Sequence, residues 1–210
     1  MTEDEARSWL LVSHVPRETL TRIEAFIALL TEEMLRQNLI AESTLPHIWA
    51  RHIVDSAQLL PLAPSGAEAW LDLGSGAGFP GLLVAMIDPA KRVTLVESRR
   101  KRIDFLQRCA ESLGVSDRVS VVGSRLETID SDAFDVISAR AFAPLDRLLP
   151  LAHRFSTPKT CWLLPKGKSA ASELEAARGS WQGRFQVVPS VTDPDAAIIV
   201  ADGVQPRGRR

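Results

Sequence analysis

The most suggestive chemistry of this chain lies in one glycine-rich run that begins with an acid. Residues Asp72 to Gly81 read DLGSGAGFPG and hold four of the twelve glycines. Glycine allows positive φ and lets a bound group approach the backbone, and the first turn of a following helix offers unpaired N–H groups. The run therefore predicts a strand, a tight turn and a helix that together bind a nucleotide-like ligand.

Two cofactors compete for this turn. Gly76, Gly78 and Gly81 match the G-x-G-x-x-G dinucleotide pattern, which favours NAD. Glu97 follows at roughly the 20-residue separation at which an acid binds ribose hydroxyls, but this suits either cofactor. If the strand ends at Leu73, the turn opens at Gly74, and the third glycine of the dinucleotide pattern is then replaced by Phe79.

The acid at the start of the turn favours the second cofactor, S-adenosylmethionine. A carboxylate at Asp72 attracts the ammonium and sulfonium of that molecule and repels a pyrophosphate. Asp72, Gly74, Gly76 and Gly78 are therefore expected to form its binding site, although Asp72 as a purely structural cap of the turn stays open as an alternative.

Strands and helices alternate around this turn. The regular alternation predicts a mostly parallel, seven-stranded α/β sheet of Rossmann-like type, with helices on both faces and a β-hairpin at one edge. After a first strand that ends at Leu73, strands are expected at 93–97, 119–122, 134–138, 160–164, 185–188 and 196–200, and helices at 80–87, 100–113, 145–155 and 169–178.

Composition divides the chain into three parts. Apolar residues recur at helical spacing before a Pro- and Gly-containing linker at Pro61–Gly66, which predicts a helical N-terminal extension over 1–65. The cofactor-binding domain follows over 66–203. The basic segment 204–210 is expected to be a disordered tail.

Bulk properties indicate a cytoplasmic protein. We expect no signal peptide and no membrane span, because no apolar run approaches the roughly 18 residues that a span requires. Cys109 and Cys161 lie in apolar surroundings and are expected to be reduced core residues. The net charge of -1 argues against binding nucleic acid by overall charge, but Arg99–Arg102 and the Lys166 and Lys168 pair leave a local basic face possible.

Several motifs together resemble the bacterial 16S ribosomal RNA guanine-N7 methyltransferases, also called the glucose-inhibited division protein B family. The resemblance covers roughly residues 30 to 200 and is far more specific than the glycine run alone. The motifs are Asp72–Gly81, Leu95–Ser98 with Lys101 and Arg102, Ser138–Leu145 and Pro165–Lys168, preceded by Asn38–Ile40 and Arg51–Ser56.

The resemblance implies roles for individual residues. Cofactor contacts are implied for Gly74, Phe79, Leu126, Glu127 and Arg140, with Glu97 on the ribose, although a packing role for Phe79 is equally open. Arg140 is also expected to face the substrate as the catalytic residue. Together with Lys166 and Lys168 it is expected to hold RNA phosphates or the guanine edge.

The implied reaction needs little from the protein beyond orientation. Guanine N7 carries a lone pair at neutral pH, so it can attack a sulfonium methyl in line without a general base, and proximity alone is worth several kcal/mol. No metal site is expected. His52, beside Asp55, is expected to be a structural hydrogen-bonding residue.

These observations predict an S-adenosylmethionine-dependent methyltransferase that modifies a guanine N7 in 16S ribosomal RNA, either naked or in the small ribosomal subunit, and that acts as a monomer. Two alternatives stay open. One is an NAD-dependent oxidoreductase, and the other is a non-catalytic RNA-binding module on the same fold.

Overall fold

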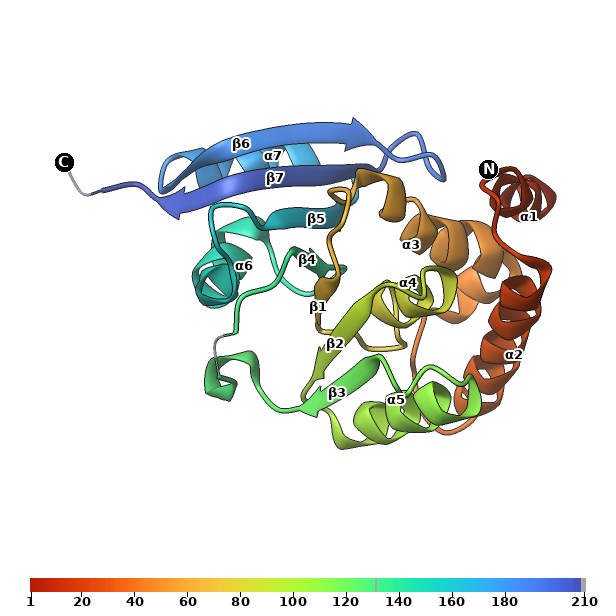
Figure 1. Ribbon diagram of the computed structural model, residues 1–210. Coiled ribbons are helices and arrows are strands. Elements are labelled where there is room, and N and C mark those ends of the chain that lie inside the picture. The colour runs from red at the N-terminus through yellow and green to blue at the C-terminus, as the bar shows by residue number, and fades with distance from the viewer. Residues whose placement is uncertain (131, 209–210) are drawn as a thin grey trace.

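The computed structural model describes residues 1–130 and 132–208, and its centre is one seven-stranded sheet (Figure 1). The strand order is β3-β2-β1-β4-β5-β7-β6. The first five of these strands run parallel, whereas β7 is antiparallel to both β5 and β6. The strands are β1 (Ala69–Leu73), β2 (Arg92–Glu97), β3 (Val119–Gly123), β4 (Val136–Ala139), β5 (Cys161–Lys166), β6 (Trp181–Pro189) and β7 (Ala197–Pro206). The predicted sheet and its terminal hairpin are confirmed.

Helices cover both faces of the sheet, as the alternation predicts (Figure 1). One core cluster joins the sheet to α4, α5 and the N-terminal helices, and the other joins it to α6 and α7. The helices are α1 (Glu3–Val12), α2 (Arg17–Glu33), α3 (Asp55–Ala57), α4 (Gly81–Ile87), α5 (Arg100–Ser112), α6 (Leu145–Ala152) and α7 (Ala170–Arg178). No helix in the described part of the chain is both long and apolar enough to cross a bilayer.

The N-terminal segment packs as part of the same core rather than as a separate body. Its buried residues, including Phe26, belong to the cluster that contains the α4 and α5 side chains, and the Phe26 and Phe79 rings meet edge to face at 5.3 Å. Between α2 and the sheet lie short 3-10 turns (Glu42–His47 and Leu60–Leu62) and a π-helical segment, η2 (Trp49–Val54). A turn of π-helix is rare and often marks a functional position.

The strand order reverses at the centre of the sheet, and this reversal determines where a ligand-binding crevice can form. β2 and β3 lie on one side of β1, whereas β4 and β5 lie on the other. Leu73 pairs with Ala139, so Gly74 and Arg140 leave the carboxyl ends of neighbouring strands together. Ligands of open α/β sheets bind at such a switch point.

Three expected boundaries need correction. The helix expected at 145–155 ends at Ala152 and continues as a 3-10 turn over His153–Phe155, and β6 begins at Trp181, earlier than expected. β7 continues to Pro206, with Val204 buried, so the expected disorder of the tail is wrong for residues 204–206. Gln205 and Pro206 pair with Gln182 and Trp181 of β6, so the sheet continues into this segment. Residues 209 and 210 lie outside the described part.

Candidate functional site

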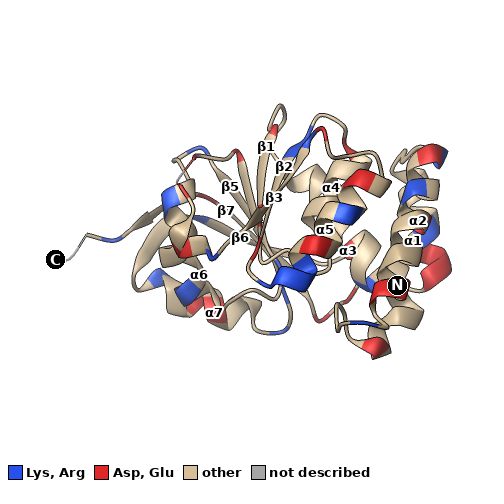
Figure 2. Cartoon of the chain, turned by 90° about the horizontal axis from the view of Figure 1, so that it is seen from below, with Lys and Arg blue, Asp and Glu red and all other residues tan. Residues whose placement is uncertain are grey.

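A cavity of about 950 Å³ opens at the carboxyl ends of the strands. Its lining includes the glycine turn after β1, the η2 region, the β4–α6 loop, the β5–α7 segment and the β6–β7 loop, together with residues of the segment between α2 and η2. Basic residues cluster at the start of α5 (Figure 2), and Arg102 of that helix lines the cavity. The volume falls within the range of small-molecule sites.

The glycine turn has the backbone that its sequence predicts. Gly74, Gly76 and Gly78 have φ values of 68, 55 and 95°, a region that favours glycine, and β1 ends at Leu73 as the register argument requires. Gly74 and Gly76 line the cavity, whereas Gly78 faces the Leu82 and Leu106 side chains of α4 and α5.

Asp72 lies beneath the turn rather than in the cavity. Its carboxylate is fully buried, accepts a 2.7 Å hydrogen bond from Ser138 Oγ, and accepts a second, of 3.2 Å, from the Gly81 N–H. Burial raises the pKa of Asp72, and the hydrogen bonds from Ser138 oppose that shift. Each carboxylate oxygen thus accepts a hydrogen bond inside the fold, which favours the capping alternative for Asp72, and a cofactor contact of Asp72 stays a prediction.

Glu97 holds the same turn from β2. Its Oε2 accepts a hydrogen bond of 3.1 Å from the Gly76 N–H, and its Oε1 accepts bonds from the N–H groups of Ser98 and Arg99. Arg102 approaches Oε2 at 3.7 Å. The carboxylate thus fixes two loops, and ribose binding by Glu97 stays a prediction.

Phe79 packs inside a stack of three side chains at the rear of the cavity. Its ring is 2% exposed and stacks on the His52 ring at 5.1 Å, with the Arg140 guanidinium 5.1 Å from its centroid. The ring therefore packs against the Arg140 guanidinium, which favours the packing alternative for Phe79, and a cofactor contact of Phe79 stays a prediction.

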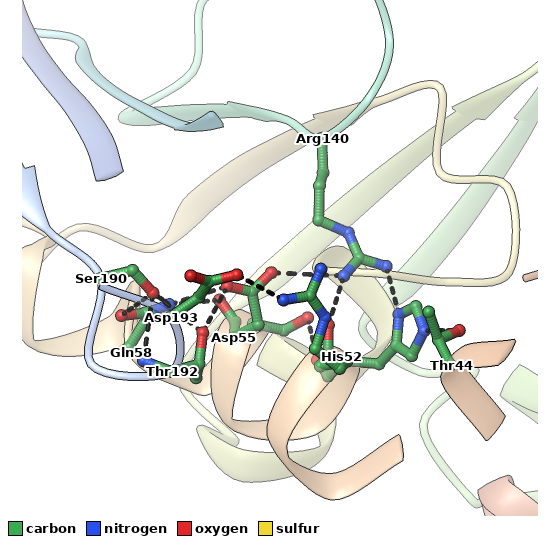
Figure 3. Close-up of polar contacts among 10 residues, drawn as sticks. Thr44, His52, Asp55, Gln58, Arg140, Ser190, Thr192 and Asp193 are labelled. Atoms are coloured by element: carbon green, nitrogen blue, oxygen red, sulfur yellow. Dashed lines mark hydrogen bonds and ion pairs between the residues drawn. The ribbon is translucent and has the colours of Figure 1, made fainter. Parts of the chain in front are cut away.

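Arg140 reaches from the end of β4 to the η2 region, where it makes a dense set of polar contacts (Figure 3). Its Nη1 donates to the Arg51 carbonyl at 3.2 Å and pairs with Asp55 Oδ2 at 3.3 Å, and its Nη2 lies 3.0 Å from His52 Nδ1. The guanidinium side chain is 19% exposed. Burial lowers the pKa of Arg140, and the charge of Asp55 opposes this shift.

His52 is a neutral acceptor in this contact. Burial, and then the charge of Arg140, lower the pKa of His52 to about 3. Because arginine can only donate, Nδ1 must accept, and Nε2 then carries the proton and donates to Thr44 Oγ1 at 2.8 Å. The structural hydrogen-bonding role predicted for His52 is confirmed.

The contacts continue from Asp55 to the β6–β7 loop (Figure 3). Asp55 Oδ1 accepts from Thr192 Oγ1 at 3.2 Å and from Gln58 Nε2 at 2.9 Å, and Gln58 Oε1 accepts from the Val191 N–H at 2.9 Å. Arg51 pairs with Asp193 at 2.6 Å. Positions 51, 55 and 58 follow helical spacing, so one polar face of the η2 region anchors the loop.

This anchor could not be predicted from the sequence. The spacing of Arg51, Asp55 and Gln58 indicates a shared helical face, but their partners lie more than 130 residues further along the chain. Short-range spacing carries no information on such partners.

The two predicted substrate lysines both line the cavity, and both are paired. Lys166 Nζ lies 2.8 Å from Glu173 and donates to the Ala143 carbonyl at 2.9 Å, with its side chain 10% exposed. Lys168 pairs with Asp195 at 2.9 Å and is 81% exposed. Lys168 is thus accessible to a phosphate, whereas Lys166 is held in the wall.

Leu126 and Glu127 do not line this cavity. They lie in the 3-10 turn η4 (Leu126–Thr128) after β3, with Leu126 buried and Glu127 exposed. Arg154 fixes this turn by donating to the Leu126 carbonyl at 2.6 Å. Their predicted cofactor contacts stay predictions.

The two cysteines lie in the core, as predicted. Cys109 and Cys161 are free and buried, and burial raises the pKa of their thiols to about 12 and about 11. Within residues 1–130 and 132–208, no group of three or more His, Cys, Asp or Glu side chains could hold a metal ion.

The fold and the position of the cavity define the class of protein, and comparison with solved structures agrees. A protein titled as a SAM-dependent methyltransferase from Aquifex aeolicus aligns with a TM-score of 0.57 at 18% identity, covering 75% of this chain and 93% of that one. At this identity the likeness shows the fold, which is the Rossmann-like fold of class I methyltransferases.

Sequence comparison then gives the family. A family profile described as rRNA small subunit methyltransferase G matches residues 19–197. The chain is 66% identical over 210 residues to the Ribosomal RNA small subunit methyltransferase G of Rhizorhabdus wittichii, covering 100% of this chain and 96% of that protein. It is 51% identical over 220 residues to the Zymomonas mobilis protein of the same name, covering 100% and 98%. The chain belongs to the rRNA small subunit methyltransferase G family.

Proposed function

We propose that this protein transfers a methyl group from S-adenosylmethionine to the N7 of a guanine in 16S ribosomal RNA. The observation that carries the proposal is the cavity at the switch point, where the glycine turn meets the Arg140 loop in a chain of this family. The family match supports S-adenosylmethionine as the cofactor, and guanine N7 as the acceptor atom is what the resemblance of the motifs implies.

The residues of the glycine turn fit the cofactor. Gly74 and Gly76 add no side chain of their own to the cavity, and the Phe142 ring lies against Gly74. Asp72 and Glu97 hold the turn by accepting hydrogen bonds from its N–H groups. When bound, the cofactor would supply an electrophilic methyl group. We propose that the turn, Arg140, Glu97 and the Leu126–Glu127 pair hold it.

The state of the titratable side chains supports an acceptor that needs no deprotonation. The four acids that line the cavity are each paired with a cation: Asp55 with Arg140, Glu173 with Lys166, Asp193 with Arg51 and Asp195 with Lys168. His52 Nδ1 accepts from Arg140, which leaves it unsuited to take a proton from a substrate. Guanine N7 already carries its lone pair, so the residues need only orient the two ligands and exclude water.

The RNA side of the proposal rests on the cations at the cavity mouth. Lys168, exposed beside Asp195, can exchange that carboxylate for an RNA phosphate, and Arg140 can bind a phosphate or the cofactor carboxylate. We propose 16S ribosomal RNA or the small ribosomal subunit as partner, and a cytoplasmic monomer as the working form.

The test is a mapped methyl transfer. The protein is incubated with S-adenosylmethionine bearing an isotopically labelled methyl group and with small subunits that lack the modification, and the 16S RNA is digested for mass spectrometry. We expect one labelled 7-methylguanosine. Binding of S-adenosylmethionine without transfer to this RNA would contradict the proposal, and RNA binding without cofactor binding would favour the non-catalytic module.

An NAD-dependent oxidoreductase is not favoured. β1 ends at Leu73, so the turn opens at Gly74 and the dinucleotide pattern is out of register, as the sequence indicates. The family match points the same way.

A further inference from the structure

Phe142 is an exposed aromatic side chain at the mouth of the cavity. It is 36% exposed, and in residues 1–130 and 132–208 every other Phe and Trp is more buried. The cavity lining includes Phe142 together with Arg140 and Lys166. An exposed aromatic ring beside cations is the composition of a site that stacks a nucleic-acid base.

The chain holds this ring against the glycine turn. A Cβ at Gly74 would collide with the Phe142 ring, so the absence of a side chain at Gly74 makes room for it. A planar group lying on Phe142 would thus lie next to the turn that is proposed to hold the cofactor.

The segment that carries Phe142 is fixed at both ends. Arg140 is bound by Asp55 and His52, while Lys166 donates to the Ala143 carbonyl and Glu173 accepts from the Leu145 N–H at 2.9 Å. Between these anchors Ala141 has a φ of 52°, a value uncommon outside glycine. Because this loop is already fixed, binding a base to Phe142 does not require the loss of conformational entropy that ordering a flexible loop would cost.

We propose that Phe142 is the stacking platform for the acceptor base. This inference rests on the proposed function, and it adds the residue that positions the guanine beside the methyl donor. Methylation at N7 makes the purine ring cationic, and a cation is attracted to the face of an aromatic ring, whereas it is repelled by a guanidinium. Phe142 thus also favours the charge that develops on the base.

The experiment compares Phe142→Ala, Phe142→Leu and Phe142→Trp with the parent protein. Methyl transfer to unmodified small subunits gives kcat/KM for RNA, and calorimetry with S-adenosylmethionine alone gives the cofactor Kd. We expect the Ala and Leu variants to lose about 5- to 150-fold in kcat/KM, the factor that corresponds to the ~1–3 kcal/mol of one base–aromatic stack. Phe142→Trp should keep most of the activity, and all three should bind cofactor within about twofold of the parent.

Leu11→Ala serves as a matched control, because it removes an exposed apolar side chain on α1 that does not line the cavity. Full activity of Phe142→Leu would show a packing role and overturn the proposal. A loss of cofactor affinity in step with activity would show that the ring contacts the cofactor, and it would overturn the proposal as well. Failure of the proposed function is separate, since the parent protein would then place no methyl group on guanine N7.

Discussion

The two sides of the cavity are held together by different kinds of contact. On the cofactor side, Asp72 and Glu97 are 0% and 6% exposed and accept hydrogen bonds from backbone N–H groups of the glycine turn. On the acceptor side, side-chain pairs join the wall segments, from Arg140–Asp55 at 19% and 18% exposure to Lys168–Asp195 at 81% and 61%. Buried contacts to backbone are costly to break, whereas exposed pairs contribute little to stability and yield to a competing ion. The cofactor side is thus expected to be rigid and the acceptor side exchangeable.

The largest effect is expected from Asp72→Ala, because it leaves the Gly81 N–H and the Ser138 hydroxyl without their buried acceptor. We expect a loss of ~3 kcal/mol in the free energy of unfolding, measured in urea, and at least a tenfold weaker cofactor Kd. Asp72→Asn is the control, since it keeps the shape and one acceptor oxygen, and it should lose less. Unchanged stability and unchanged cofactor binding in Asp72→Ala would contradict the conclusion that the cofactor side is rigid.

A smaller loss is expected from Asp55→Asn, which removes the charge that faces Arg140. Because that pair is partly exposed, we expect ~1–2 kcal/mol of destabilisation, together with a fall in methyl transfer. The control is Asp193→Asn, which breaks the Arg51 contact in the same loop and leaves the Asp55 contacts in place. Equal losses of activity in the two variants would show that the loop, and not Arg140, is what Asp55 positions.

The next effect is a pH dependence set by His52. Its pKa is about 3 in the folded protein, against an ordinary value of 6.5, so the unfolded chain binds a proton that the folded chain does not. Stability from this residue is present above pH 6.5 and is lost as the pH falls towards 3. When the pH falls from 7.5 to 5.5, the free energy of unfolding should decrease in both proteins. We expect this decrease to be ~1 kcal/mol smaller in His52→Gln than in the parent protein. Parallel losses in the two proteins would contradict a neutral His52.

The smallest effect on stability is expected at the Lys168–Asp195 pair. Both Lys168→Ala and Asp195→Asn should unfold at the same urea concentration as the parent. Their effects on RNA should be opposite, because Lys168→Ala removes a phosphate partner and Asp195→Asn removes its competitor. We expect weaker RNA binding with a shallower salt dependence for the first, and tighter binding for the second. Changes of the same sign would show that the pair is purely structural.

The difference between the cofactor side and the acceptor side of the cavity also explains how much could be predicted from the sequence. The glycine turn is encoded by ten consecutive residues, so its positive φ values and the end of β1 follow from local pattern. The acceptor side brings together Asp55, Arg140 and Thr192, whose contact distances follow only from the finished sheet. Asp72 shows the limit within the turn itself, because spacing places the acid at the strand end but does not say that its carboxylate points to Ser138 and Gly81.

We expect the cavity to bind the cofactor against the glycine turn and the acceptor against the opposite wall, with Arg140 able to contact both ligands, and two variants with two readouts test this division most directly. Cofactor Kd and methyl transfer to RNA are measured on Gly74→Val, which strains the positive-φ turn and collides with the adjacent Phe142 ring, and on Lys166→Ala, which changes the opposite wall. We predict that Gly74→Val loses cofactor binding, and that Lys166→Ala binds cofactor within about twofold of the parent protein while its RNA methylation falls roughly tenfold or more. Equal losses of cofactor binding in the two variants would contradict the division.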